Sequence, residues 1–281
     1  MKDVQDIPLA LLCDLPYREV PAWYNATRRT LHLDLVCARD KSVRPAILWF
    51  CGGAFQQMDY HLWMPELFKY AEQGFAVASA EYRVGILGQW PAAVEDAWAA
   101  IEYLRKNSAE LGIDPDHIAV MGESAGGLLA TSLGLGICRP EGCAPVQACV
   151  NFYGVTNLRS MAEFEKKENL NSVCSFMNGM PQEKSEIYRK ANPLENVSSL
   201  ASPFLILHGS NDKRVPIKQS EELRDRLMGC GVFASLLTIP GAVHGDSQVY
   251  CGKIREKVLE FRTIVPRYCD NSRIEKKEKS R

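Results

Sequence analysis

Apolar and polar residues follow two different periods along this chain, and each period predicts a different kind of element. Short and almost continuous apolar runs are typical of strands buried on both faces of a sheet. These runs occupy residues 46–51, 75–80, 117–121, 148–154 and 204–210, and a last strand is expected at 233–240. The run at 30–36, TLHLDLV, alternates instead, which indicates a half-exposed strand.

Amphipathic segments with helical spacing separate the apolar runs. One is MPELFKYAEQG, which should end at Gly74, and another is EELRDRLMGCG. The longest is WPAAVEDAWAAIEYLRKNSAELG, whose apolar residues fall on one helical face. Buried strands alternating with helices predict the α/β class, with a mostly parallel, doubly wound sheet covered on both faces. The alternating strand at 30–36 is expected at an antiparallel edge of that sheet.

The spacing of these elements predicts a single α/β domain over residues 1–281. Residues 156–203 contain no clear core strand, and their polar middle is interleaved with Phe and Met side chains. We interpret this stretch as an excursion over the sheet, either a small lid or a long connection. The last twelve residues, 270–281, hold five basic and three acidic side chains and read as a polar, solvated tail.

Composition narrows the function classes. The formal net charge is -1, so neither a nucleic acid nor an anionic membrane is expected as the main partner. No apolar run reaches the ~18 residues of a membrane span, and the first residues do not resemble a signal peptide. The ten cysteines form no CxxC pair and no Cys/His cluster, which argues against zinc and favours reduced thiols in a cytoplasmic protein. No metal or cofactor is expected, and the sequence is silent on the oligomeric state.

The stretch MGESAGG carries the first chemical signal. It fits G-x-S-x-G at Gly122, Ser124 and Gly126, with an apolar strand directly before it and a helix directly after it. A serine on such a sharp turn projects its hydroxyl above the sheet edge, beside a helix N-terminus. Without a base the hydroxyl is a poor nucleophile, so this motif also fits a glycine-serine helix cap with no chemistry.

Five histidines are available as the base, and His244 fits best. It lies in PGAVHGD, a glycine-flanked loop after the last predicted strand, where the order serine, acid, histidine places the base. The acid should follow a strand that lies between Ser124 and His244 in the chain, and FLILHGSNDKRVP offers Asp212. Asp246 is the rival, but it is two residues from His244 on the same loop, which is poor geometry for orienting the imidazole. His208 is expected to be a hydrogen-bonded structural residue.

Together these stretches resemble the α/β-hydrolase superfamily. The shared features are the loop in WFCGGAF, the elbow in MGESAGG, and the segments HGSNDKRVP and PGAVHGD. The chain is most similar to serine carboxylesterases of the hormone-sensitive-lipase-like group, over about residues 28 to 262. Within that group it looks most like the bacterial acetyl-xylan and feruloyl esterase branch, which also contains kynurenine-formamidase-like enzymes.

The resemblance gives the two glycines of WFCGGAF a role. It implies an oxyanion hole built from the backbone N–H groups of Gly52, Gly53 and Ala125. The family usually begins this loop with histidine, and here the position is Cys51. The donors are main-chain groups, so cysteine does not abolish the hole, but it removes a polar anchor and is expected to pack as a buried thiol.

The expected function is hydrolysis of small soluble esters by a Ser124–His244–Asp212 triad through an acyl-enzyme. Short acyl chains are favoured, with acetyl or feruloyl groups on oligosaccharides suggested by the resemblance alone. Two alternatives remain open. One is an amide hydrolase, such as a formamidase or a peptidase-like enzyme. The other is a hydrolase-fold protein that binds a small molecule without turnover.

Overall fold

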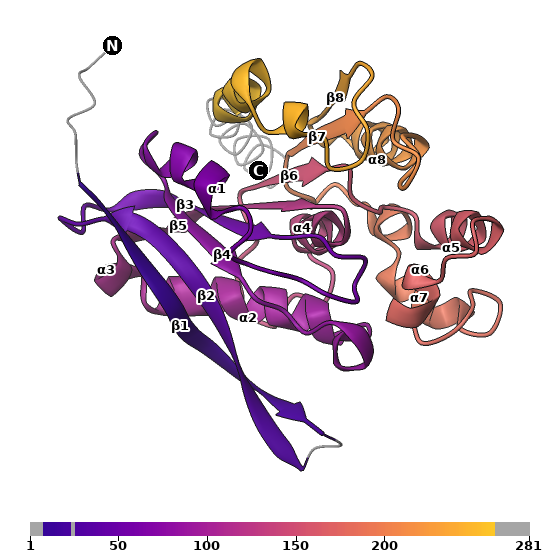
Figure 1. Cartoon of the computed structure of the whole chain (residues 1–281), viewed down its shortest axis with the longest axis horizontal. Coiled ribbons are helices and arrows are strands. Elements are labelled where there is room, and N and C mark those ends of the chain that lie inside the picture. The colour runs from indigo at the N-terminus through magenta and orange to yellow at the C-terminus, as the bar shows by residue number, and fades with distance from the viewer. Residues whose placement is uncertain (1–7, 24–25, 262–281) are drawn as a thin grey trace, which may run out of the picture.

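The computed structural model describes residues 8–23 and 26–261. Among them, eight strands form one twisted sheet in the order β1-β2-β4-β3-β5-β6-β7-β8 (Figure 1). The neighbours from β4 to β8 are parallel, as the continuous apolar runs predicted. The strands are β1 Leu9–Ala22, β2 Thr27–Ala38, β3 Arg44–Phe50, β4 Ala76–Ala80, β5 Ile113–Glu123, β6 Ala148–Phe152, β7 Phe204–Gly209 and β8 Ala234–Ile239.

Strand β3 shows why the central runs are apolar throughout. Successive side chains point to opposite faces of a sheet, and both faces of this sheet are covered. One face of the segment contributes Ala46, Leu48 and Phe50 to the larger core, and the other contributes Ile47, Trp49 and Cys51 to the smaller one. The sheet therefore separates two apolar cores.

Helices cover both faces and close these cores. The larger core receives the apolar faces of α2 Ala92–Lys106, α4 Ala125–Leu135 and α8 Lys218–Gly229. The smaller core receives α1 Met64–Ala71 and the helical residues 252–261. The connecting α3 Ser108–Leu111 ends at Gly112, whose φ of 66° suits a glycine C-cap. This is the α/β-hydrolase architecture.

The antiparallel edge is confirmed, but it holds one strand more than predicted. Strand β2 pairs antiparallel with β4, and β1 pairs antiparallel with β2 at the outer edge. Two register shifts interrupt β1, and it carries Pro16 and Pro21. These features suit an edge strand and also remove the alternation by which the strand could have been recognised.

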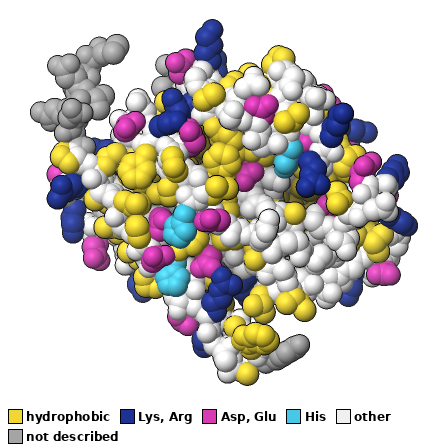
Figure 2. Space-filling model, viewed as in Figure 1, with side chains coloured by type: hydrophobic (Ala, Val, Ile, Leu, Met, Phe, Trp, Pro, Cys, Tyr) yellow, Lys and Arg dark blue, Asp and Glu magenta, His cyan; other side chains and the backbone are white. Residues whose placement is uncertain are grey.

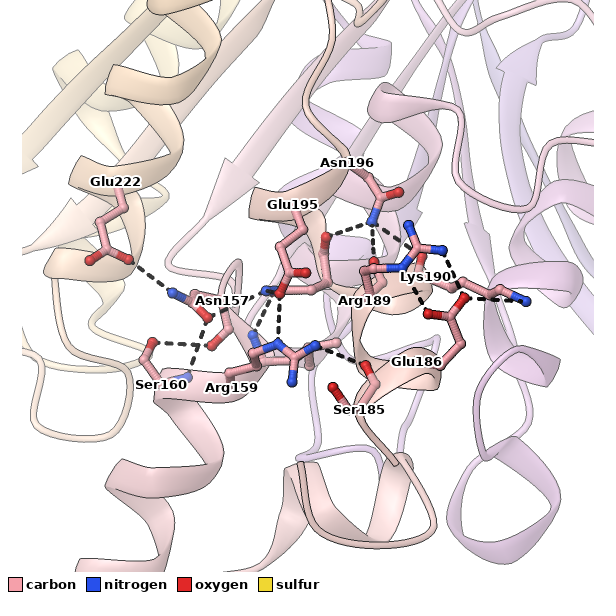
Figure 3. A network of polar contacts seen from close by, with 12 residues as sticks. Asn157, Arg159, Ser160, Ser185, Glu186, Arg189, Lys190, Glu195, Asn196 and Glu222 are labelled. Carbon is pink, nitrogen blue, oxygen red and sulfur yellow. Dashed lines mark hydrogen bonds and ion pairs between the residues drawn. The ribbon is translucent and has the colours of Figure 1, made fainter. Parts of the chain in front are cut away.

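The excursion at 156–203 is helical. It contains α5 Leu158–Lys167, α6 Ser172–Phe176, α7 Ser185–Ala191 and the short 3-10 helix η2 Pro193–Asn196. Side chains tie these pieces together: Arg159 Nε donates to Glu195 Oε1 at 2.7 Å, and Asn196 Nδ2 donates to the carbonyl of Arg189 at 2.9 Å (Figure 3). Asn157 Nδ2 reaches Glu222 Oε2 of α8 at 3.2 Å.

Charged side chains of both signs are interspersed over the face shown in Figure 2, without a large patch of one sign. Within the described ranges, none of the helices combines the length and the apolar character needed to cross a membrane. The predicted polar tail at 270–281 lies outside the described residues.

Candidate active site

Ser124 lies between β5 and α4, on the turn predicted from the glycine spacing. Its φ of 53° and ψ of -118° are unusual for a residue with a side chain and are typical of a nucleophile elbow. The Ser124 N–H donates to the carbonyl of Phe152 at 3.0 Å, which fixes the turn to the end of β6. A Cβ on Gly126 would lie 2.1 Å from the carbonyl oxygen of Phe50, so only glycine allows α4 to start this close to β3.

The structure brings together the three side chains that the sequence singled out. His244 Nε2 lies 3.0 Å from Ser124 Oγ, and His244 Nδ1 lies 2.7 Å from Asp212 Oδ2. The Asp212 carboxylate is fully buried, whereas the His244 ring is 22% exposed. A hydroxyl, an imidazole and a buried carboxylate thus form one hydrogen-bonded chain, which is the geometry that a nucleophile, its base and an orienting acid require.

Two loops at the carboxyl edge of the sheet hold this acid and base. The Asn211 N–H donates to the carbonyl of Ala242 at 3.0 Å, and the Gly241 N–H donates to Ser210 Oγ at 2.8 Å. These contacts join the loop after β7 to the loop after β8. Parallel strands end at one edge, so residues 120 positions apart in the chain meet there.

The charge of Asp212 is stabilised by several donors. Its Oδ1 accepts the N–H groups of Arg214 and Val215 at 2.8 and 2.9 Å. Burial acts to raise the pKa of Asp212, but the hydrogen bonds from His208, His244 and Val215 outweigh it and hold that pKa well below its usual range. Asp212 is thus ionised at neutral pH.

His208 has the structural role that was expected. It is fully buried, with Nδ1 2.7 Å from Ser220 Oγ and Nε2 2.9 Å from the carbonyl of Val215. Its Nε2 also lies 3.4 Å from Asp212 Oδ2. This contact with Asp212 was not predicted from the sequence, although the two residues are only four positions apart in HGSND.

The rival acid and bases are engaged elsewhere. Asp246 Oδ1 accepts the Gln248 N–H at 3.0 Å and caps the 3-10 helix η3 Ser247–Val249. His61 and His117 pair through Nδ1 with carboxylates of Asp34 and Asp114 at 2.7 and 2.8 Å. His32 lies 3.7 Å from Glu81. Among the described residues, no group of three or more His, Cys, Asp and Glu side chains is placed to hold a metal ion.

The glycine loop requires one correction. The Gly52 N–H donates to Glu123 Oε1 at 2.6 Å, so this group is already used and does not face an oxyanion. Gly53 has a φ of 135°, and a Cβ there would lie 1.9 Å from the carbonyl oxygen of Gln57, so glycine is required. Among the described residues no acceptor is found for the N–H groups of Gly53, Ala54 and Ala125.

Cys51 is a packed thiol at the start of this loop. It is 1% exposed, and burial raises the pKa of its thiol to about 12, so it is protonated at neutral pH. Its carbonyl accepts the Tyr82 hydroxyl at 2.7 Å, which anchors the backbone where the usual histidine is missing. Nine cysteines lie in the described part of the chain, and all nine are free.

Solved structures share this fold. A truncated carbohydrate esterase from gut microbiota superposes with a TM-score of 0.75 at 23% identity, covering 92% of this chain and 97% of that one. The acetyl ester-xyloside bifunctional hydrolase of Caldicellulosiruptor lactoaceticus gives a TM-score of 0.71 at 25% identity, covering 90% and 98%. Both comparisons extend over almost the whole of the other protein.

Relatives are also found by sequence. Esterase LipC of Mycobacterium tuberculosis is 30% identical over 230 residues, which cover 76% of this chain and 56% of LipC. The chain spans about half the length of the curated relatives it matches. Residues 33–227, more than half of the chain, match the BD-FAE family. The chain therefore belongs to the BD-FAE family of α/β-hydrolases.

Proposed function

We propose that this protein is a serine carboxylesterase that hydrolyses small esters through an acyl-enzyme on Ser124. The observation that carries the proposal is the pair of contacts through His244, 3.0 Å to Ser124 Oγ and 2.7 Å to Asp212 Oδ2. The names of the relatives support the same chemistry, since LipC is an esterase and LipM is a probable carboxylic ester hydrolase.

The mechanism follows from the order of these contacts. Ser124 Oγ attacks the ester carbonyl carbon while His244 Nε2 takes the hydroxyl proton. Asp212 orients the ring through Nδ1 and stabilises the imidazolium. The tetrahedral intermediate collapses, the alcohol leaves with the proton from Nε2, and the acyl group stays on Ser124. Water, deprotonated by His244, then attacks the acyl-enzyme and releases the carboxylic acid.

The oxyanion of the intermediate needs preorganised donors. We assign this role to the N–H groups of Gly53 and Ala125, with Ala54 as the next donor along the loop. Ala125 is the first residue of α4, so the positive end of the helix dipole adds to its hydrogen bond. Each such donor contributes roughly 3 kcal/mol to lowering the barrier.

The substrate is proposed to be a short acyl ester, with acetyl groups on small oligosaccharides as the favoured natural form. Support comes from the structural neighbours, a carbohydrate esterase and an acetyl ester-xyloside bifunctional hydrolase. An amide substrate is the alternative within the same mechanism, because the triad can also protonate a leaving amine.

A matched pair of substrates tests this proposal. We expect p-nitrophenyl acetate to be hydrolysed and p-nitroacetanilide, which differs in the leaving atom, to be hydrolysed far more slowly. A series from acetate to octanoate should lose kcat/KM with chain length. Preference for the anilide would favour the amide hydrolase, and no turnover of any member by folded protein would favour a non-catalytic binder.

A further inference from the structure

The residue before the nucleophile, Glu123, has no part in the triad and is nevertheless buried beside it. Glu123 is the last residue of β5 and is only 9% exposed. A buried carboxylate is costly unless donors satisfy it. Glu123 Oε1 accepts the Gly52 N–H at 2.6 Å and the Trp63 Nε1–H at 3.3 Å.

The Gly52 contact joins the elbow to the glycine loop. A Cβ on Gly52 would lie 2.7 Å from Glu123 Oε1, so the loop backbone rests directly against the carboxylate. Gly52 immediately precedes Gly53, and Glu123 immediately precedes Ser124. One short hydrogen bond therefore fixes the loop that carries the oxyanion donors relative to the nucleophile that creates the oxyanion.

The Trp63 contact extends this anchor to an aromatic cluster beside His244. The Trp63 ring packs on Tyr250 at 4.1 Å between centroids, and the Tyr250 hydroxyl bonds that of Tyr153. The Tyr153 ring meets the His244 ring edge to face at 4.7 Å. Burial is the main cause that raises the pKa of both phenols, and the Glu123 charge adds to it, so both stay protonated.

We propose that Glu123 is the positioning residue of the oxyanion hole, holding the Gly52 N–H so that the following N–H groups face the substrate. The loop lacks the histidine that usually anchors it, and Cys51 offers no equivalent polar contact to the elbow. This proposal rests on the proposed esterase function, because it assigns Glu123 an effect on the transition state.

The test compares Glu123→Ala and Glu123→Gln with Glu165→Ala. Glu165 is a matched control, because it is 3% exposed and its carboxylate also accepts a backbone N–H, that of Val173 at 2.8 Å. With p-nitrophenyl acetate, Glu123→Ala should lower kcat by about 10- to 100-fold while KM changes less than about threefold. Glu123→Gln keeps an acceptor oxygen and should stay within about fivefold of wild-type kcat.

Hydrogen–deuterium exchange provides a readout that does not depend on turnover. Peptides covering residues 51–57 should exchange faster in Glu123→Ala and unchanged in Glu165→Ala. Unchanged exchange in Glu123→Ala, or an equal loss of kcat in both alanine variants, would overturn the proposal. If the wild type hydrolyses no ester, the esterase function fails alone, and the exchange rates still decide whether Glu123 holds the loop.

Discussion

The carboxyl group of Asp212 is buried and held by several neighbouring groups. Four protein groups surround it: the His244 ring, the His208 ring and the backbone N–H groups of Arg214 and Val215. This environment explains both how the acid orients the base and why its pKa is depressed. Asparagine in its place would keep the shape but remove the charge and impose the wrong tautomer on His244.

We therefore expect Asp212→Asn to lower kcat by about 10³- to 10⁴-fold, as at comparable acids of serine hydrolases.

The pH dependence of stability should also differ between the wild type and Asp212→Asn. A depressed pKa means that ionised Asp212 stabilises the fold above its ordinary pKa of 3.8, and that this contribution is lost as the pH falls from there toward the depressed value. Urea unfolding at pH 6, 4 and 3 should show the gap between wild type and variant narrowing below about pH 4; a constant gap would contradict this account of Asp212.

For Cys51 we expect the opposite result, a substitution that leaves activity almost unchanged, because nothing in its environment activates the thiol. Its raised pKa, about 12, and its burial leave a packed thiol whose loop is held by Tyr82 and Glu123. Cys51→Ala should keep kcat within about threefold of wild type and lower the free energy of unfolding by about 1 kcal/mol. A loss of activity above a hundredfold in folded Cys51→Ala would mean that the thiol takes part in the chemistry.

At the scale of elements, the excursion over the sheet is held to α8 through Gln219. This side chain is 4% exposed, and its Oε1 accepts the N–H groups of Thr156 and Asn157 at 2.9 and 2.7 Å. Its Nε2 donates to Ser160 Oγ at 3.0 Å. The network around Asn157 and Arg159 continues this attachment (Figure 3). These contacts attach the excursion to α8.

Gln219→Ala would leave the buried N–H of Thr156 and the half-buried N–H of Asn157 without an acceptor. We expect the free energy of unfolding to fall by about 2 to 4 kcal/mol, since each unsatisfied donor costs about 1 to 3 kcal/mol. Gln182→Ala, on an exposed turn of the same excursion, should change it by less than about 0.5 kcal/mol. Equal effects of the two substitutions in chemical denaturation would show that the attachment through Gln219 contributes nothing.

The elements that could be predicted from the sequence carry local signals, and the features that could not be predicted depend on contacts between distant residues or on an interrupted pattern. The buried parallel strands and the elbow were predictable because their apolar runs and the spacing of Gly122, Ser124 and Gly126 are local signals. Strand β1 was not predictable, because its prolines and register shifts interrupt the alternation of apolar and polar residues. The role of Gly52 was misassigned for a similar reason. Its partner Glu123 lies 71 residues away, and no local pattern reports that contact.

Across the whole molecule, one buried carboxylate joins the edge hairpin, formed by β1 and β2, to the core. Asp96 of α2 is fully buried and accepts Arg18 Nη1 of β1 at 2.7 Å. It also accepts Arg83 Nε at 2.7 Å and the Arg83 N–H at 3.0 Å, from the segment after β4. Strand β1, the segment after β4 and helix α2 thus meet at one charge, although Arg18 lies 78 residues from Asp96 in the chain.

Asp96→Ala should lower the free energy of unfolding by about 3 to 5 kcal/mol, because it leaves the mostly buried Arg83 with only the half-exposed Glu95, 3.8 Å away, as a counter-charge. The matched control is Asp225→Ala, which breaks the exposed pair with Arg224 and should cost less than about 1 kcal/mol. Thermal or urea unfolding measures both. A small effect at Asp96 would mean that this charge cluster does not hold the hairpin to the core.

The central claim is that Ser124 is a nucleophile activated by His244. Covalent labelling by diethyl p-nitrophenyl phosphate, followed by intact-mass and peptide mass spectrometry, tests it most directly. We expect one diethylphosphoryl group per chain, located on Ser124, in the wild type and in Cys51→Ala, and none in Ser124→Ala. Labelling that persists in Ser124→Ala, or no labelling of the folded wild type, would contradict the claim.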